Sequence, residues 1–181
     1  LCAGRSTFAL VPPSILSGPR PTQLTVDHTA IAVQEAVAVA SDARRGTVLL
    51  VRQFRLPVFL QGHREPLIEA CAGLLDDNDP ETCIRLETEQ ELGYTLGSVR
   101  RVYDIYMSPG SVTERLSFFV AEYSPDDRVS DGGGDPSEGE DIEVLEMPLS
   151  EAMALVESGG IMDAKTVMLI QYAVLKGLAR G

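Results

Sequence analysis

Two glutamates near the middle of the chain have the type and spacing of a cation site. Glu87 and Glu91 stand four residues apart in a stretch that predicts a short helix, begun by Pro80 and ended by Gly93, so both carboxylates lie on one face. Gly73, just before this helix, lets the backbone come close. Carboxylate and carbonyl oxygens are the ligands that Mg²⁺ prefers. The spacing therefore predicts half of a divalent cation site.

The elements that must position this pair are mostly strands. Runs of β-branched and aliphatic residues predict strands over residues 31–40, 47–55, 66–72, 98–108, 115–123 and 141–148. Helical spacing of apolar residues predicts two further helices, over about 148–158 and 166–178. These helices are too few to cover a doubly wound parallel sheet, so the predicted fold class is α/β or α+β, a sandwich of helices and a sheet.

Two loops join these elements. One passes through Pro57 and Gly62, and the other is the acidic, glycine-rich segment over residues 124–140. A loop as long as the second one is usually functional or disordered in a small domain.

The totals limit the class of protein. A chain of 181 residues forms one compact domain, which we place at residues 28–181 after an N-terminal arm over residues 1–27 with one edge strand near 23–26. The formal charge of −12 disfavours nucleic acid as a partner, and no apolar run is long enough to span a bilayer. Three cysteines without metal-ligand spacing favour a reduced, cytoplasmic protein.

The central stretch resembles the Nudix box, whose pattern is Gly, five residues, Glu, seven residues, then Arg-Glu-apolar-x-Glu-Glu-x-Gly-apolar. The positions that fit it are Gly73, Glu87, Glu91, Gly93 and Tyr94. Four positions depart from it: Asp79 stands for the first Glu, Leu86 for the Arg, Thr88 for the apolar residue and Gln90 for the first Glu of the pair. The loop is also one residue short.

A longer resemblance extends over residues 46–175. The motifs that carry it are VRQFR, LIEACAGLLDDNDPETCIR, YMSPGSVTER, FFVAEYS, the triple glycine, EDIEVLEMP and KTV. In this order they look like the GDP-mannose pyrophosphatase type within the ADP-ribose pyrophosphatase branch of the Nudix hydrolases. The resemblance implies an α/β/α sandwich with a mixed sheet, and a homodimer whose N-terminal strands are swapped.

The resemblance also implies an activity, which is hydrolysis of the diphosphate in a nucleotide sugar with the help of Mg²⁺, with Mn²⁺ as the alternative ion. The nearest likeness gives GDP-mannose as the substrate, with GMP and mannose 1-phosphate as the products, and ADP-ribose is the next candidate.

The resemblance assigns roles by position. The metal ligands would be the Ala72 carbonyl, Glu87, Gln90 and Glu91. The residues that bind substrate would be Arg52 or Arg55, as a clamp on the diphosphate, and Glu114. Besides Glu91, the catalytic residue would be Glu138 or Glu140 on the long loop, either of which could position or deprotonate the attacking water.

Two departures from the box support a second hypothesis. Gln90 brings an amide in place of a charged carboxylate, and Leu86 removes a guanidinium that orients a box carboxylate in the family pattern. Such a domain could bind a nucleotide sugar as a sensor or partner module while having lost turnover.

Overall fold

The computed structural model describes residues 34–110, 112–138 and 140–179, and a mixed sheet of seven strands forms its centre within these residues. The strands are β1 (Gln34–Asp42), β2 (Thr47–Gln53), β3 (Leu67–Glu69), β4 (Cys71–Leu74), β5 (Val99–Tyr106), β6 (Arg115–Glu122) and β7 (Ile142–Pro148). Their order is β3-β2-β1-β6-β5, with β4 also beside β1 and β7 beside β2. The pair of β1 and β6 is parallel and the other pairs are antiparallel, so the predicted mixed sheet is confirmed.

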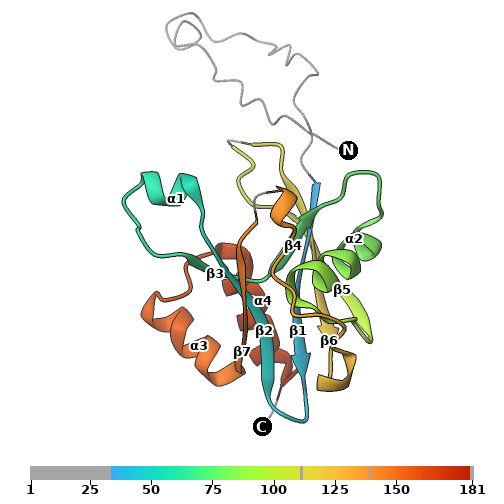
Figure 1. Ribbon diagram of the computed structural model, residues 1–181. Helices are drawn as coiled ribbons and strands as arrows, with labels where there is room; N and C mark the ends of the chain where they lie inside the picture. The colour runs from blue at the N-terminus through green and yellow to red at the C-terminus, as the bar shows by residue number, and fades with distance from the viewer. Residues whose placement is uncertain (1–33, 111, 139, 180–181) are drawn as a thin grey trace, which may run out of the picture. The chain divides into compact units, whose positions relative to one another are not determined.

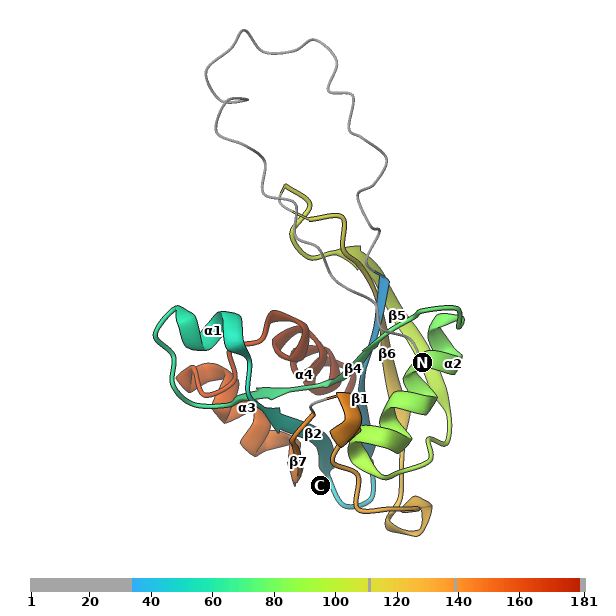
Figure 2. The same ribbon diagram turned by 45° about the horizontal axis from the view of Figure 1, so that its top comes forward.

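Helices cover both faces of this sheet. The helical elements are α1 (Leu56–Leu60), α2 (Pro80–Glu87), a π-helix (Thr88–Leu92), α3 (Leu149–Ser158) and α4 (Ala164–Lys176). Figures 1 and 2 show α2 on one side of the central strands, and α3 and α4 on the other. The three layers confirm the predicted α/β/α sandwich.

The core is divided by the sheet into two apolar clusters. The α2 side contains Leu49, Ile84 and Phe119, and the α3–α4 side contains Phe118 and Ile170. Successive strand residues point to opposite faces, and here both faces are covered, so β6 is buried without a break from Leu116 to Ala121.

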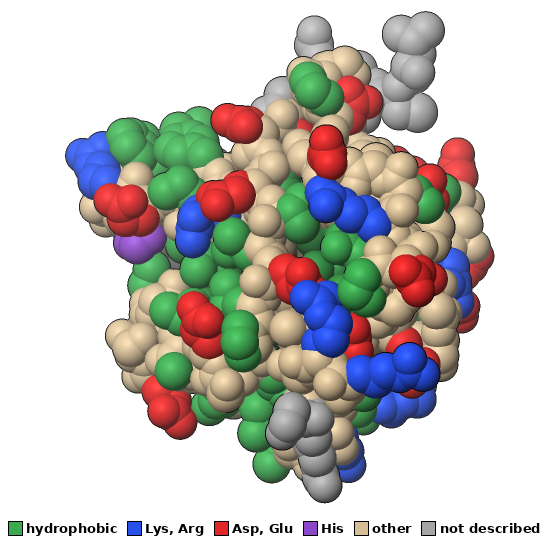
Figure 3. Space-filling view, turned by 60° about the horizontal axis from the view of Figure 1, so that its bottom comes forward, with side chains coloured by type: hydrophobic (Ala, Val, Ile, Leu, Met, Phe, Trp, Pro, Cys, Tyr) green, Lys and Arg blue, Asp and Glu red, His purple; other side chains and the backbone are tan. Residues whose placement is uncertain are grey.

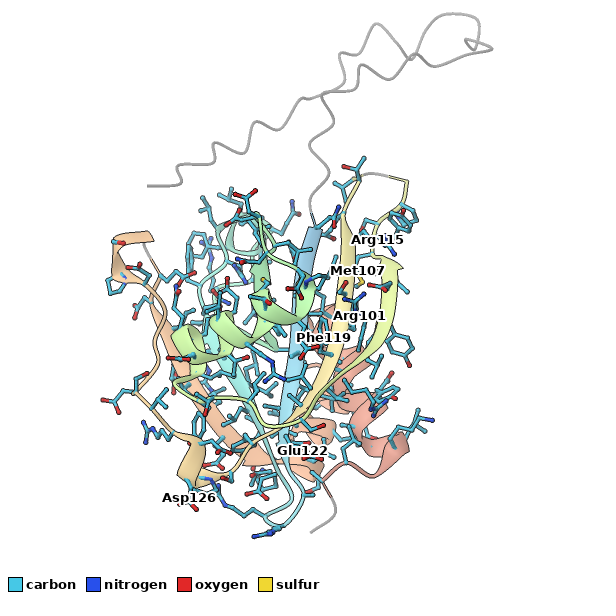
Figure 4. All side chains as sticks on the ribbon, turned by 90° about the vertical axis from the view of Figure 1, so that its right-hand side faces the viewer. Arg101, Met107, Arg115, Phe119, Glu122 and Asp126 are labelled. Atoms are coloured by element: carbon cyan, nitrogen blue, oxygen red, sulfur yellow. The ribbon has the colours of Figure 1, made fainter. Side chains whose placement is uncertain are left out.

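The α2 side of the sheet extends onto β5. The guanidinium of Arg101 on β5 lies 5.4 Å from the centre of the Phe119 ring, and Figure 4 labels both side chains. Truncating a buried aromatic ring such as Phe119 to alanine would cost about 3 to 5 kcal/mol, because a cavity would remain.

The site is built where β1 and β2 separate. Near their turn the two strands pair directly, through Ala40 with Leu49. Towards their other ends β2 pairs with β3 and β1 pairs with β4, so the segment 67–74 crosses the opening between them. This crossing brings the backbone at Ala72 and Gly73 opposite Val37 and Ala36, next to α2.

Three details differ from the expectations. The loop through Pro57 and Gly62 contains α1, whose first turn holds Pro57, a residue suited to that position. The strand predicted over 66–72 is split at Ala70 into β3 and β4, because its halves pair with different strands. The helix predicted over 80–93 changes to π geometry at Thr88.

The N-terminal arm of residues 1–27, its strand near 23–26 and its swapping lie outside the described residues. Among the described residues, no helix is long and apolar enough to cross a membrane.

Candidate functional site

Glu87 lies directly against the backbone of Gly73. A Cβ atom added to Gly73 would come within 2.1 Å of the Glu87 Cδ and 2.2 Å of its Oε1. No residue other than glycine therefore fits beside this carboxylate in its present position. The predicted approach of Gly73 to the acidic helix is confirmed.

Glu91 is buried, with 3% of its surface exposed, and its surroundings are unusual for an acid. The Cys71 thiol and the backbone N–H of Ala72 donate hydrogen bonds to its carboxylate, whereas its Oε2 atom has no hydrogen-bond partner among the described residues. Burial raises the pKa of Glu91 to about 7, and the charges of Glu87 and Glu140 add to this rise, while the two hydrogen bonds oppose it.

The long glycine-rich loop closes the end of the helix that carries Glu91. The backbone N–H of Gly133 donates to the carbonyl of Glu91 (2.9 Å), and that of Gly134 donates to the carbonyl of Gln90 (3.2 Å). These carbonyls belong to the last turn and have no partner within the helix. Gly132 has a φ of +68°, and a Cβ there would lie 2.4 Å from the Glu91 carbonyl oxygen. Figure 2 shows the loop passing beside this end of the helix.

The same loop brings Glu140 to the site. Its Oε2 atom accepts a hydrogen bond from the backbone N–H of Asp135 (2.8 Å) and one from the Gln90 amide (3.4 Å). Gln90 therefore contacts Glu140, and its role as a metal ligand stays a prediction. Glu138 ends a short 3₁₀ turn, Pro136–Glu138, and the role assigned to its side chain stays a prediction.

Arg55 is paired with the buried acid Glu69 and is also affected by the charge of Glu91. Its Nε and Nη2 atoms donate to the two carboxylate oxygens of Glu69 at 2.8 and 3.1 Å. Although partial burial lowers the pKa of Arg55, the hydrogen bonds and charge of Glu69 and the charge of Glu91 outweigh this and raise it. Arg55 thus lies within electrostatic reach of the carboxylate that we assign to the metal.

A second cation, Lys165, lies on α4. The Lys165 side chain is 21% exposed, and its Nζ atom contacts the Asp163 carboxylate at 2.8 Å. Burial lowers the pKa of Lys165, but the charges of Asp163, Glu69 and Glu35 outweigh this and raise it.

Hydrogen bonds tie this lysine to the segment that carries Ala72. Asp163 begins α4 by accepting hydrogen bonds from the N–H and the hydroxyl of Thr166, at 2.9 and 2.7 Å. The Thr166 hydroxyl oxygen in turn accepts one from the backbone N–H of Ala70 (2.7 Å). The KTV motif at residues 165–167 was the sequence signal for this group.

Glu35 at the start of β1 completes this charged group and was not predicted. Burial raises its pKa, the nearby charge of Glu114 adds to the rise, and Lys165 and Arg55 oppose it. The predicted substrate residue Glu114 thus lies close to Glu35. No local motif marks Glu35, since its position depends on the pairing of β1 with β4.

Arg52 has a different environment from Arg55. It lies opposite Glu143 in the pair of β2 and β7, and its Nη1 atom donates to the Glu143 carboxylate at 2.8 Å. Both side chains are exposed, at 39% and 59%. The two arginines that the sequence offered as alternatives thus differ: Arg52 pairs with an exposed glutamate and Arg55 with a buried one.

Three other positions of the box have structural explanations. Asp79 begins α2 by accepting hydrogen bonds from the N–H groups of Glu81 and Thr82, so it acts as a helix cap. Arg85 pairs with Glu81 and donates to the carbonyls of residues 96 and 97, so it does not replace the missing guanidinium at Leu86. The Leu86 side chain points to solvent and is 55% exposed.

The donor set fits a hard divalent cation. Among the described residues, no three Asp, Glu, His or Cys side chains come together closely enough to hold a metal by themselves. Glu87, Glu91 and the Ala72 carbonyl would therefore hold it together with water and substrate oxygens, as Mg²⁺ often is held. The buried Glu91 Oε2 atom accepts no hydrogen bond from the described residues, and such an ion would give it a partner.

A mixed sheet between helices, with an acidic helix against a glycine-containing strand, is the architecture of a Nudix domain. The sequence confirms this class: residues 33–167 match the family described as the NUDIX domain, and the chain belongs to this family. Nudix hydrolases generally require a divalent cation such as Mg²⁺.

Three relatives of this chain have the same name. The chain is 55% identical to the GDP-mannose pyrophosphatase of Pectobacterium atrosepticum over 134 residues, which are 74% of this chain and 68% of the relative. It is 48% identical over 144 residues, 79% of this chain and 74% of the relative, to the GDP-mannose pyrophosphatases of Shigella dysenteriae serotype 1 and Escherichia coli O157:H7.

Proposed function

We propose that this protein hydrolyses the diphosphate of a nucleotide sugar, and that GDP-mannose is its substrate. The observation that carries the proposal is the approach of Glu87, Glu91 and the backbone of residues 72 and 73 to one another, with the charge of Arg55 near Glu91 and that of Lys165 near Glu69. The relatives named GDP-mannose pyrophosphatase support this substrate, and ADP-ribose is the next one to test.

The residues divide the reaction between them. A Mg²⁺ ion held by Glu87, Glu91 and the Ala72 carbonyl would neutralise the diphosphate and stabilise charge that develops on it. Arg55 would bind a diphosphate oxygen, since guanidinium groups suit phosphate. Glu140 would orient a water and accept its proton, after which the water oxygen bonds to phosphorus and the bridging P–O bond breaks. The products are GMP and mannose 1-phosphate.

A second candidate function rests on Gln90. Its amide donates to Glu140, so it occupies part of the hydrogen-bonding capacity of the proposed base and brings no charge to the metal. A domain altered in this way could bind a nucleotide sugar without cleaving it. Mn²⁺ remains an alternative ion for either function, because it also takes carboxylate and carbonyl ligands.

Turnover separates the two candidates. With GDP-mannose and Mg²⁺, we expect the wild type to release GMP and Glu91→Gln to lose at least about 100-fold in kcat, because the neutral amide holds the ion weakly. ADP-ribose is assayed in parallel to rank the substrates. Absence of turnover in the wild type together with turnover in Gln90→Glu would refute the enzymatic function.

The metal assignment has its own test. Gly73→Ala would push the flexible end of Glu87 aside, so we expect a normal melting temperature but roughly tenfold weaker Mg²⁺ binding by calorimetry. Gly110→Ala is the matched control, since a Cβ at Gly110 meets nothing within 4 Å. Equal Mg²⁺ affinity in the wild type and Gly73→Ala would show that Glu87 is not a ligand.

We further propose that the protein is a cytoplasmic homodimer with neither a nucleic-acid nor a membrane partner. The net charge of −12 disfavours nucleic acid and anionic lipid surfaces. Cys71 and Cys83 are both free and buried, in keeping with a reducing compartment. The apolar side chains exposed around α1 support an interface with a second copy.

A further inference from the structure

We propose that Glu69 is a positioning residue, which holds the Arg55 guanidinium in the orientation that binds the diphosphate. The inference rests on the proposed function, because it takes Arg55 as a ligand of the substrate. It adds a residue to the site that neither the Nudix box nor the metal ligands include.

The geometry of the pair is that of a fixed fork. Both carboxylate oxygens of Glu69 accept from Arg55, one from Nε and one from Nη2. The Glu69 side chain is 3% exposed, whereas that of Arg55 is 42% exposed. The acid is therefore held in the interior, and the arginine, held by it, presents its remaining N–H groups outward.

The neighbouring arginine shows that this arrangement is specific. Arg52 also pairs with a glutamate, but through Nη1 alone, and its partner Glu143 is 59% exposed. Exposed pairs of this kind contribute little and hold neither side chain firmly. Two Arg–Glu pairs on the same strand end thus differ in burial and in the number of hydrogen bonds, which makes one a natural control for the other.

The location of Glu69 explains why this pair of hydrogen bonds matters for the site. Glu69 ends β3, directly before the crossing to β4 that carries Ala72. Arg55 lies two residues beyond the end of β2, directly before α1, where no strand pairing holds it. The charge of Glu91 also attracts Arg55. An unrestrained guanidinium would therefore pair with Glu91 and compete with the cation for its carboxylate. Glu69 keeps Arg55 near the metal ligands without letting it occupy their place.

This role predicts which step is affected. Without Glu69, Arg55 keeps its charge but its long side chain becomes free to move. Substrate binding must then offset the entropy lost when this side chain is ordered. We expect Glu69→Gln to raise KM for GDP-mannose and the Kd for GDP by roughly 10-fold or more, as loss of hydrogen bonds to a charged group does. The value of kcat should change by less than about threefold.

A double-mutant cycle with Arg55→Lys tests whether Glu69 acts through Arg55. Lysine keeps the charge but cannot form the fork, so Glu69→Gln in that background should raise Kd by less than about twofold. A merely structural role of Glu69 would give the same loss in both backgrounds. Glu69→Asp, which keeps the carboxylate on a shorter side chain, should lie between the wild type and Glu69→Gln and replaces the amide variant if that one fails to fold.

Glu143→Gln is the matched control and should leave KM and the Kd for GDP unchanged. Binding of GDP in the presence of Mg²⁺, measured by calorimetry, separates this inference from the proposed function. If the wild type lacks turnover but binds GDP, and Glu69→Gln weakens that binding, the positioning role stands alone. Equal Kd values for the wild type and Glu69→Gln, or no GDP binding by either, would overturn it.

Discussion

Glu91 is the acid of the candidate site whose environment is most unusual. Its carboxylate is buried, accepts hydrogen bonds from Cys71 and Ala72, and has an oxygen without a hydrogen bond among the described residues. A buried acid in this state binds either a proton or a cation, because an uncompensated charge is costly in the interior. In the metal-free protein, ionisation of Glu91 should therefore lower the free energy of unfolding.

The first residue-scale prediction concerns pH. Burial raises the pKa of Glu91 from an ordinary 4.5 to about 7, so between these values the folded protein holds a proton that the unfolded chain has released. Stability then falls as pH rises through this range, by on the order of 3 kcal/mol for this group.

Urea unfolding in EDTA at pH 5 and pH 8 measures the effect. Glu91→Gln cannot ionise, so it should be more stable at pH 8 than the wild type by about this amount. A pH dependence that is the same in both proteins would contradict the shift. Saturating Mg²⁺ should restore stability at pH 8 in the wild type alone.

The sequence predicted the residues of the site that lie in one local pattern. The spacing of Glu87 and Glu91 and the position of Gly73 are encoded within one stretch, and their approach is seen. Glu69 was missed because its role depends on contacts between elements distant in sequence, and Lys165 was indicated only by the KTV motif. The contact of Gln90 with Glu140, fifty residues apart, was hidden for the same reason.

At the scale of elements, the loop of residues 124–140 caps the end of the helical segment of residues 80–92. Its glycines reach the carbonyls that end the helix at Gln90 and Glu91, and the same loop holds Glu140 through the N–H of Asp135. The π turn at Thr88–Leu92 was not predicted, since it leaves no signature in a periodicity of 3.6 residues. The backbone of this loop thus fixes both the end of the helix that carries Glu91 and the side chain of Glu140.

Substitution of Gly132 tests this cap. A Cβ at Gly132 would lie 2.4 Å from a backbone oxygen at a φ of +68°, so Gly132→Ala should lose roughly 2 to 4 kcal/mol of unfolding free energy, together with turnover. Gly159 has a similar φ of +79° but open space around it, so Gly159→Ala should lose only about 1 kcal/mol and keep turnover. Urea denaturation gives both values, and equal losses would refute a steric role of the loop.

At the scale of the whole molecule, the apolar pattern of the sequence predicted the layers of the fold but did not predict how the strands pair. Apolar runs such as 47–55 and 115–123 predicted strands, and the small number of helices predicted a sandwich. No pattern indicated that β1 would pair in parallel with β6, or that the segment 67–74 would bridge β1 and β2, because register depends on the assembled sheet.

Among the described residues, an apolar patch around α1 is exposed. None of the α1 residues is buried, and Phe54, Leu56 and Leu60 are 55%, 56% and 73% exposed. Hydrophobic side chains gather over α1 in the upper left of Figure 3. Contiguous apolar surface of this kind usually marks an interface. Since the family resemblance implies a dimer, we infer that a second copy of the chain covers this patch.

Molar mass measured by light scattering tests this interface. The wild type should give about 39 kDa, twice the chain mass of 19.5 kDa. Leu56→Ser combined with Leu60→Ser should shift the protein to the monomer, because the interface loses the burial of two large apolar side chains, each contributing roughly 1.5 to 3 kcal/mol. Leu175→Ser, at a position on α4 that is 81% exposed and away from α1 in sequence, should stay dimeric. A double variant that stays at 39 kDa would remove α1 from the interface, and a wild type at 19.5 kDa would refute the dimer itself.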